Sequence, residues 1–168
     1  DGKSWGAWQK HGLSFGRDAA VVWKVPEGHW RTYIQYTEVN GLQSPAPEKT
    51  EGPFTEFIID RTPPTVTIQN PASQAKLRGG HKVTVRWAAN DANLAADSVS
   101  IEYSRAGDGR YETVASGLPS SGTFEWLVPT DMTISGSLRI AARDHAKSLD
   151  GSVNVGVAES TQLLIDSI

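Results

Sequence analysis

The chain has 168 residues, of which 38% are hydrophobic and 21% charged, a composition typical of one large or two small soluble globular domains. Its formal net charge of −3 provides no basic field, so nucleic-acid binding by phosphate neutralisation is not expected. The absence of cysteine excludes disulfides, thiolate catalysis and cysteine-ligated metals, and no apolar run is long enough to span a membrane in this segment.

The first third of the chain contains short runs in which apolar and polar residues alternate. These runs cover 21–25, 30–36 and 57–59, and a period of two is the pattern of half-buried β-strands. A loop rich in Pro, Gly and Glu, at 42–53, separates the second run from the third. No window of helical length sustains apolar residues at helical spacing, so we expect strands and no helix.

The segment Arg61-Thr62-Pro63-Pro64 follows the last of these runs. Each proline fixes its own φ and lacks a backbone donor. The sequence therefore predicts a short, stiff junction that holds two modules end to end rather than a flexible linker.

The rest of the chain contains more alternating runs, separated by turn residues. Gly107-Asp108-Gly109 predicts a tight hairpin turn, because glycine tolerates positive φ. The predicted strands are 66–68, 83–87, 99–103, 111–115, 124–128, 138–142 and 163–165. Short strands with one apolar face, within about 100 residues, predict a β-sandwich of two sheets.

The two parts of the chain resemble each other. Trp23-Lys24-Val25-Pro26 matches 126–129, and Phe57-Ile58-Ile59-Asp60 matches 163–166, at separations of 103 and 106 residues. This period suits sandwich modules and is too long for a solenoid. We predict a partial module at 1–61, with later strands only, and a complete module at 62–168. The apolar strands of the first would be covered by a second chain, an upstream segment or the second module.

Several segments resemble bacterial immunoglobulin-like and fibronectin type III-like repeats. Residues 60–68 are similar to the linker and first strand of such repeats, and 138–144 to their penultimate strand. Residues 104–111 resemble the Asp-box hairpin, with Tyr111 where the box has Trp. The resemblance implies an all-β tandem of immunoglobulin-like modules in a secreted or cell-surface protein. Such modules serve as spacers, adhesive units or accessory domains beside an enzyme.

Catalytic motifs are not found in the sequence. There is no Gly-x-Ser-x-Gly elbow, and the Gly79-Gly80 pair precedes a predicted strand rather than a helix N-terminus. We interpret the histidines as solvated loop or strand-end residues: His11, His29, His81 and His145. We therefore predict no enzyme activity, no catalytic residue and no cofactor-binding residue.

One group of oxygen-bearing residues is a candidate calcium site. In a sandwich of this topology, the loops after the second strand and before the last strand lie at one end. Those loops hold Asp91, Asn93 and Asp144, and the preceding module ends at Asp60 beside them. Calcium binds six to eight such oxygens. The alternative, which we favour, is that these residues form turns and bond their own backbone, so we assign no metal ligand.

The aromatic residues suggest an alternative function. Trp23, Trp87 and Trp126 lie on predicted inward faces, but Trp5, Trp8, Trp30 and Tyr33 belong to the partial module and could stack on sugars. The sequence therefore favours a non-catalytic extracytoplasmic spacer or interaction module whose partner is a protein or glycan on a surface. The alternative is a carbohydrate-binding accessory domain of a secreted enzyme.

Overall fold

A computed structural model describes residues 24–32, 37–44, 55–147 and 151–166 of the chain. These residues form ten β-strands and contain no helix, which confirms the all-β prediction. Within the described ranges there is accordingly no apolar helix of a length that could cross a bilayer. The chain divides into two compact units, Asp1–Asp60 and Arg61–Ile168.

The N-terminal unit contains a two-stranded antiparallel ribbon. Strands β1 (Gly28–Thr32) and β2 (Thr55–Ile59) pair with Trp30 opposite Phe57. The side chains of both residues are half-buried. The strands predicted around Trp30 and Phe57 are thus confirmed, whereas residues 21–23 and 33–36 of the predicted strands lie outside the described residues.

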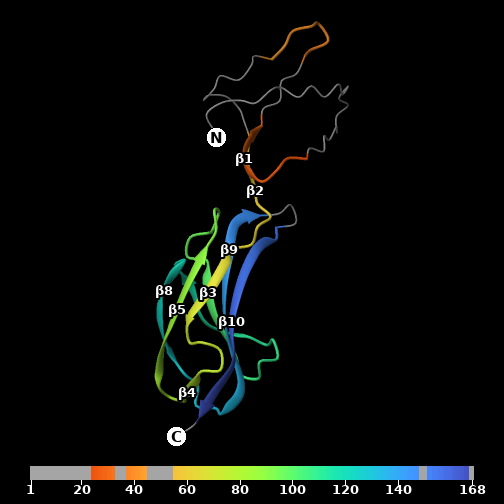
Figure 1. Cartoon of the computed structure of the whole chain (residues 1–168). Helices are drawn as coiled ribbons and strands as arrows, with labels where there is room; N and C mark the ends of the chain where they lie inside the picture. Colours follow the sequence, from red (N-terminus) through yellow and green to blue (C-terminus); the bar gives the residue numbers. More distant parts are fainter. Residues whose placement is uncertain (1–23, 33–36, 45–54, 148–150, 167–168) are drawn as a thin grey trace. The chain divides into compact units, whose positions relative to one another are not determined.

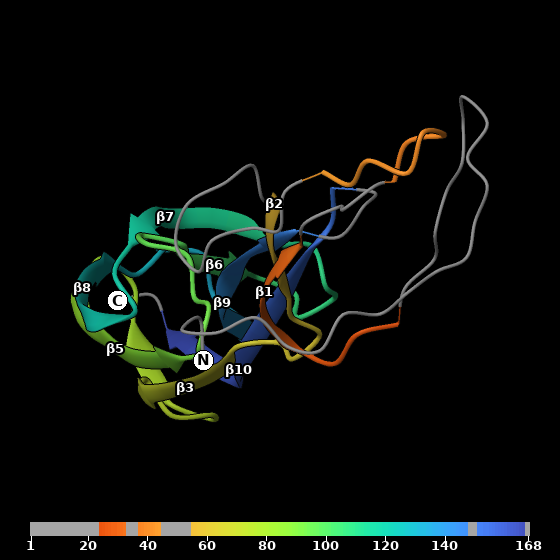
Figure 2. The same ribbon diagram turned by 90° about the horizontal axis from the view of Figure 1, so that it is seen from above.

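The C-terminal unit is a sandwich of two sheets (Figures 1 and 2). One sheet has the order β4-β10-β9-β6-β7 and the other the order β3-β5-β8. This is the strand order of an immunoglobulin-like sandwich, in which the first, second and fifth long strands face the others. The strands are β3 (Thr65–Asn70), β4 (Lys76–Arg78), β5 (Lys82–Asn90), β6 (Val99–Ser104), β7 (Glu112–Leu118), β8 (Ser121–Leu127), β9 (Thr133–Lys147) and β10 (Val153–Asp166).

The core of this unit lies between the two sheets. Every second residue of the central strands points inward, as strand geometry requires. The rings of Tyr103 and Trp126 meet there with centroids 5.1 Å apart, and Trp87 is almost completely buried. The predicted inward positions of Trp87 and Trp126 are confirmed. The most deeply buried apolar side chains are Val85, Trp87, Val99, Ile101, Val128, Leu138, Ile140, Leu163 and Ile165.

Two features of this unit differ from the prediction. Strand β4 was not predicted, because Leu77 is the one apolar side chain in its three residues and gives no alternation. Strand β9 continues through Asp144 and His145 to Lys147, whereas these residues were expected in a loop. Pairing with β10 holds this extension as far as Val153 opposite Lys147, and backbone pairing needs no apolar pattern.

The chain enters the C-terminal unit along β10. Pro64 is buried, and a Cβ atom on Gly156 would overlap the Pro64 carbonyl oxygen. Only glycine therefore allows the backbone of the junction to approach β10 this closely. Strand β10 then runs to Asp166, beside β4 at the other end of the unit (Figure 1).

Candidate functional site

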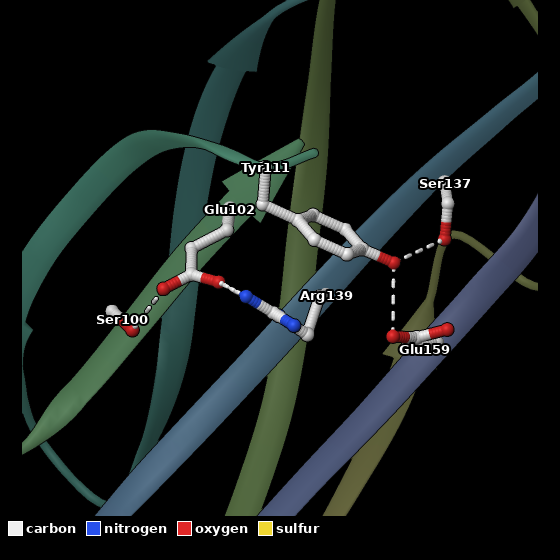
Figure 3. Close-up of polar contacts among 6 residues, drawn as sticks. All are labelled: Ser100, Glu102, Tyr111, Ser137, Arg139 and Glu159. Atoms are coloured by element: carbon white, nitrogen blue, oxygen red, sulfur yellow. Dashed lines mark hydrogen bonds and ion pairs between the residues drawn. The ribbon is translucent and has the colours of Figure 1, made fainter. Parts of the chain in front are cut away.

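A row of charged side chains crosses the outer face of the five-stranded sheet. The strand register places Glu102 of β6 opposite Arg139 of β9, and Arg139 opposite Glu159 of β10. The Nε and Nη2 atoms of Arg139 lie 2.7 and 2.5 Å from one carboxylate oxygen of Glu102 (Figure 3). The carboxylate of Glu102 also accepts a 3.3 Å hydrogen bond from Ser100. Within this row, Glu102 and Arg139 therefore form an ion pair between the neighbouring strands β6 and β9.

Tyr111 covers this ion pair. The guanidinium carbon of Arg139 lies 3.8 Å from the centre of the Tyr111 ring, a cation–π contact. The Tyr111 hydroxyl donates to Glu159 over 2.9 Å (Figure 3). Since its only proton is used there, the hydroxyl of Ser137, 3.1 Å away, donates to the Tyr111 oxygen. The Tyr111 side chain thus links strands β9 and β10.

The hydroxyl of Tyr111 stays protonated in this setting. Burial raises the pKa of Tyr111, and the Glu159 carboxylate raises it further, while Ser137 and Arg139 act in the opposite direction. A protonated hydroxyl is the donor that Glu159 requires. The guanidinium and both carboxylates thus have polar partners within the network, and we interpret the network as structural.

Two valines of β10 precede Glu159, the member of the charged row on that strand. Val155 and Val157 of β10 are 41% and 54% exposed, and they pair with Arg143 and Ala141 of β9. Single half-exposed apolar side chains are common on soluble proteins. This strip adds a small apolar surface to the sheet face and identifies no ligand.

The predicted hairpin turn after β6 is confirmed. Gly107 and Gly109 have φ of 62° and 83°, and a Cβ atom on Gly107 would overlap the carbonyl oxygen of Ser135. One carboxylate oxygen of Asp108 accepts hydrogen bonds from the Arg110 backbone (3.1 Å) and the Ser104 hydroxyl (3.2 Å). The Arg110 bond above all lowers the pKa of Asp108, against a smaller effect of burial. This carboxylate shapes the turn.

The structure brings part of the predicted calcium group together. Asn93 donates its backbone N–H to Asp91 over 2.7 Å, so Asp91 forms the turn that the favoured interpretation expected. The loop is held on β9 by a bridge between Leu94 and Asp144 and by the 2.8 Å bond from His145 to Asn93. As a result, a carboxylate oxygen of Asp91 lies within 4.8 Å of one of Asp144.

Asp144 itself is 4% exposed, and Asn154 of β10 donates a 3.1 Å hydrogen bond to it. Asn154 was missed at the sequence level, because no pattern around it distinguishes it from other strand residues. Asp60 belongs to the N-terminal unit and not to this loop. Two carboxylates are fewer than the six to eight oxygens that calcium takes, so calcium binding stays a hypothesis.

A shallow depression of about 370 Å³ adjoins the same loop. It lies between the loop after β5 and the turn after β7, with Leu94 and Pro119 in its walls and the carboxylates of Asp91 and Asp97 at its edge. Its size is at the lower end for ligand pockets. The other polar residues of its lining are Asn90 and Ser120.

The remaining predicted residues are dispersed. His29 lies on β1 with its Nε2 atom 3.9 Å from Glu56, His81 precedes β5 and His145 lies in β9; all three are exposed. Trp30 is half-buried and donates to the Pro26 carbonyl over 3.0 Å. The other residues in question lie outside the described ranges: Trp5, Trp8, His11, Trp23 and Tyr33.

Comparison with known proteins finds similarity among solved structures alone. No family model matches the chain, and no curated protein matches it. Among solved structures, the chain is similar to the fibronectin(III)-like modules of CbhA from Clostridium thermocellum. The match has 14% identity and a TM-score of 0.40, and covers 62% of this chain and 98% of that one. Our fold assignment depends on the strand order of the C-terminal unit and not on this similarity.

Proposed function

We propose that the chain is a non-catalytic, extracytoplasmic spacer or interaction module of a larger secreted or cell-surface protein. The observation that carries this proposal is that the chain enters and leaves the C-terminal unit at opposite ends of β10. Pro64 lies against Gly156, and the strand ends at Asp166. At about 3.3 Å per residue, the ten steps from Gly156 to Asp166 span about 33 Å. A unit connected in this way adds length between its neighbours.

One cross-strand pair that recurs in both hairpins supports a tandem arrangement. Trp30 pairs with Phe57 in the N-terminal unit, and Gly136 pairs with Leu163 in the C-terminal unit. Both members of the second pair lie 106 positions after those of the first. The recurrence of this backbone pair is an observation of the structure, and it is distinct from the similarity between the two segments in the sequence. It favours the N-terminal unit as the later part of a second immunoglobulin-like module.

The junction supports a stiff rather than a flexible spacer. Pro63 and Pro64 restrict two consecutive φ angles. The packing of Pro64 against Gly156 fixes the direction in which the chain leaves the C-terminal unit. On this proposal a protein or glycan on a surface is the partner, and a second chain or an upstream segment completes the N-terminal unit.

The alternative of a carbohydrate-binding accessory domain requires an exposed pair of aromatic rings. Trp30 is the one member of the suggested platform within the described residues, and it is half-buried with its indole N–H bonded to Pro26. This arrangement does not favour sugar stacking, which needs an open ring face.

The spacer proposal can be tested by a distance measurement in the full chain. Because the chain has no cysteine, spin labels can be placed at Asn40→Cys and Asp131→Cys, both in exposed turns of different units. Double electron–electron resonance should give a narrow distance distribution. Replacing Pro63 and Pro64 with glycine should broaden it, since glycine restores backbone freedom.

The matched control is Pro119→Gly, which changes an exposed proline inside the C-terminal unit and keeps the carbonyl that accepts the Trp87 N–H. It should leave the distribution narrow. A distribution already as broad in the unmodified chain as in the diglycine variant would contradict a stiff spacer.

A further inference from the structure

Four strands lie at the edges of the two sheets in the described part of the C-terminal unit: β3, β4, β7 and β8. Three of them carry features that hinder further pairing. Strand β4 has only three residues, and two of these are the exposed cations Lys76 and Arg78. The pairing of β3 with β5 shifts register after Ile68, and the pairing of β7 with β6 shifts register twice. Short strands, positive charges and bulges are the usual means by which edges avoid pairing with other chains.

Strand β8 has none of these features. Seven pairs join Ser121–Leu127 to β5 in an unbroken register, and the strand contains no lysine and no proline. Its other side has no partner strand among the described residues, and Figure 1 shows β8 at the margin of the unit. Backbone N–H and C=O groups of alternate residues therefore point outward from this edge without a cross-strand partner.

The one charged side chain of β8 does not block this edge. A carboxylate oxygen of Glu125 accepts a 2.5 Å hydrogen bond from the Thr84 hydroxyl of β5, so the carboxylate is directed toward the neighbouring strand. Phe124 packs on the core but is only half-buried, because no strand lies beyond it. The edge thus combines unpaired backbone groups with an aromatic ring that a further strand would cover.

The sequence of β8 suits antiparallel pairing with a second copy of itself. A register centred on Phe124 places each Phe124 opposite its equivalent and uses all seven residues of the strand. It sets Thr123 of one copy opposite Glu125 of the other, a pair that can form a hydrogen bond. A register centred on Glu125 would instead oppose two carboxylates, which is destabilising. Charge and ring contact therefore both favour the register centred on Phe124.

We propose that the free edge of β8 is a dimerisation surface, at which two copies of the chain join their three-stranded sheets about a two-fold axis at Phe124. The order of the joined sheet is β3-β5-β8 in one copy, continued by β8-β5-β3 of the other. The pairing uses the same edge of both copies, so it closes at a dimer. A strand of seven residues buries little surface, so the dimer is weak. This inference goes beyond the spacer role and does not depend on it.

The first test measures association of the full chain by sedimentation equilibrium up to millimolar concentration. The unmodified chain should form a dimer as its concentration rises. Phe124→Lys and Phe124→Asp should each weaken dimerisation at least about fivefold, because like charges then lie opposite each other. An equimolar mixture of the two variants should associate again, since lysine then meets aspartate, and this recovery excludes misfolding as the cause. Val114→Lys is the matched control, because Val114 is a half-buried, core-packed residue of the β7 edge, and it should leave dimerisation unchanged.

The second test maps the register by disulfide cross-linking, which is possible because the chain has no cysteine of its own. Under mild oxidation, Phe124→Cys should form disulfide-linked dimers at least about tenfold faster than Val114→Cys, since pairing holds its two thiols together. Thr123→Cys and Glu125→Cys should each react slowly alone. Mixed with each other they should form a heterodimer rapidly, because residue 123 of one copy lies opposite residue 125 of the other. This pair tests the register without changing Phe124.

An unmodified chain that stays monomeric at millimolar concentration would overturn the proposal. So would cross-linking of Phe124→Cys that is no faster than that of Val114→Cys, or faster cross-linking of Thr123→Cys alone than of its mixture with Glu125→Cys. Weakened dimerisation of Val114→Lys with normal dimerisation of Phe124→Lys would assign the interface to β7 and would also contradict it. The distance measurement between Asn40→Cys and Asp131→Cys tests the spacer role separately, so either proposal can fail without the other.

Discussion

The β1–β2 ribbon and the β9–β10 hairpin share one equivalent cross-strand pair but have different surroundings. Trp30 and Phe57 face each other in one, and Gly136 and Leu163 in the other. Leu163 is completely buried, whereas Phe57 is half-buried. In the C-terminal unit β9 also pairs with β6 and β10 with β4, while the described part of the N-terminal unit provides β1 and β2 with no further strand. The same cross-strand pair thus forms in two hairpins, whereas the burial of its side chains depends on the strands that flank each hairpin.

The largest expected effect comes from truncating the two equivalent side chains. Leu163→Ala should destabilise the C-terminal unit by about 3 kcal/mol, the usual cost of a cavity at a fully buried leucine. Phe57→Ala should cost its own unit less than half as much, although phenylalanine is larger, because its side chain is already partly hydrated. Hydrogen exchange of the β10 and β2 backbones in the full chain measures the two losses separately.

Ile134→Ala is a control for Leu163→Ala, because it shortens an aliphatic side chain of β9 that is 80% exposed and should change exchange in β10 little. Equal losses for Leu163→Ala and Phe57→Ala would mean that both hairpins are buried alike. That outcome would contradict the difference between the two regions.

The sequence predicted the strands that build the core and missed elements held mainly by backbone bonds. Val85, Trp87 and Ile140 alternate because burial on one face requires it, so their strands could be recognised. Strand β4 and the extension of β9 through Asp144 are held by pairing with β10, which any residue type can provide.

The same reason limits prediction of the candidate sites. The turn formed by Asp91 could be expected from a local preference for turns. The contacts among Glu102, Tyr111 and Arg139 could not, because Glu102 and Arg139 are 37 residues apart and meet only through the register of paired strands. Sequence patterns indicate turns and the apolar face of a strand. They do not indicate which residues of two paired strands lie opposite each other, and contacts between strands depend on that register.

A smaller effect is expected at Tyr111 of the C-terminal unit. Tyr111→Phe keeps the ring on Arg139 and loses the hydroxyl bonds to Glu159 and Ser137, so we expect a loss of about 1 kcal/mol. Tyr111→Trp should behave like the phenylalanine variant, since its ring keeps the cation–π contact without that hydroxyl. Urea unfolding measures these losses.

Tyr111→Ala removes the ring as well and should cost about 1 kcal/mol more than Tyr111→Phe, the scale of a partly exposed cation–π contact. If Tyr111→Ala were no more destabilising than Tyr111→Phe, the hydroxyl bonds and not the ring would hold the network.

The smallest expected effect concerns the charge of Asp108 in the turn after β6. Hydrogen bonds from Arg110 and Ser104 favour the carboxylate in the folded chain, so the folded pKa is lower than the unfolded one. Such a group stabilises the fold at pH above its unfolded pKa, and this contribution disappears as pH falls through the folded pKa. Carbon-13 NMR should show the Asp108 carboxyl titrating below the usual aspartate range. In Asp108→Asn this part of the acid dependence of stability should be absent, whereas an unchanged dependence would mean that the turn does not favour the charged form.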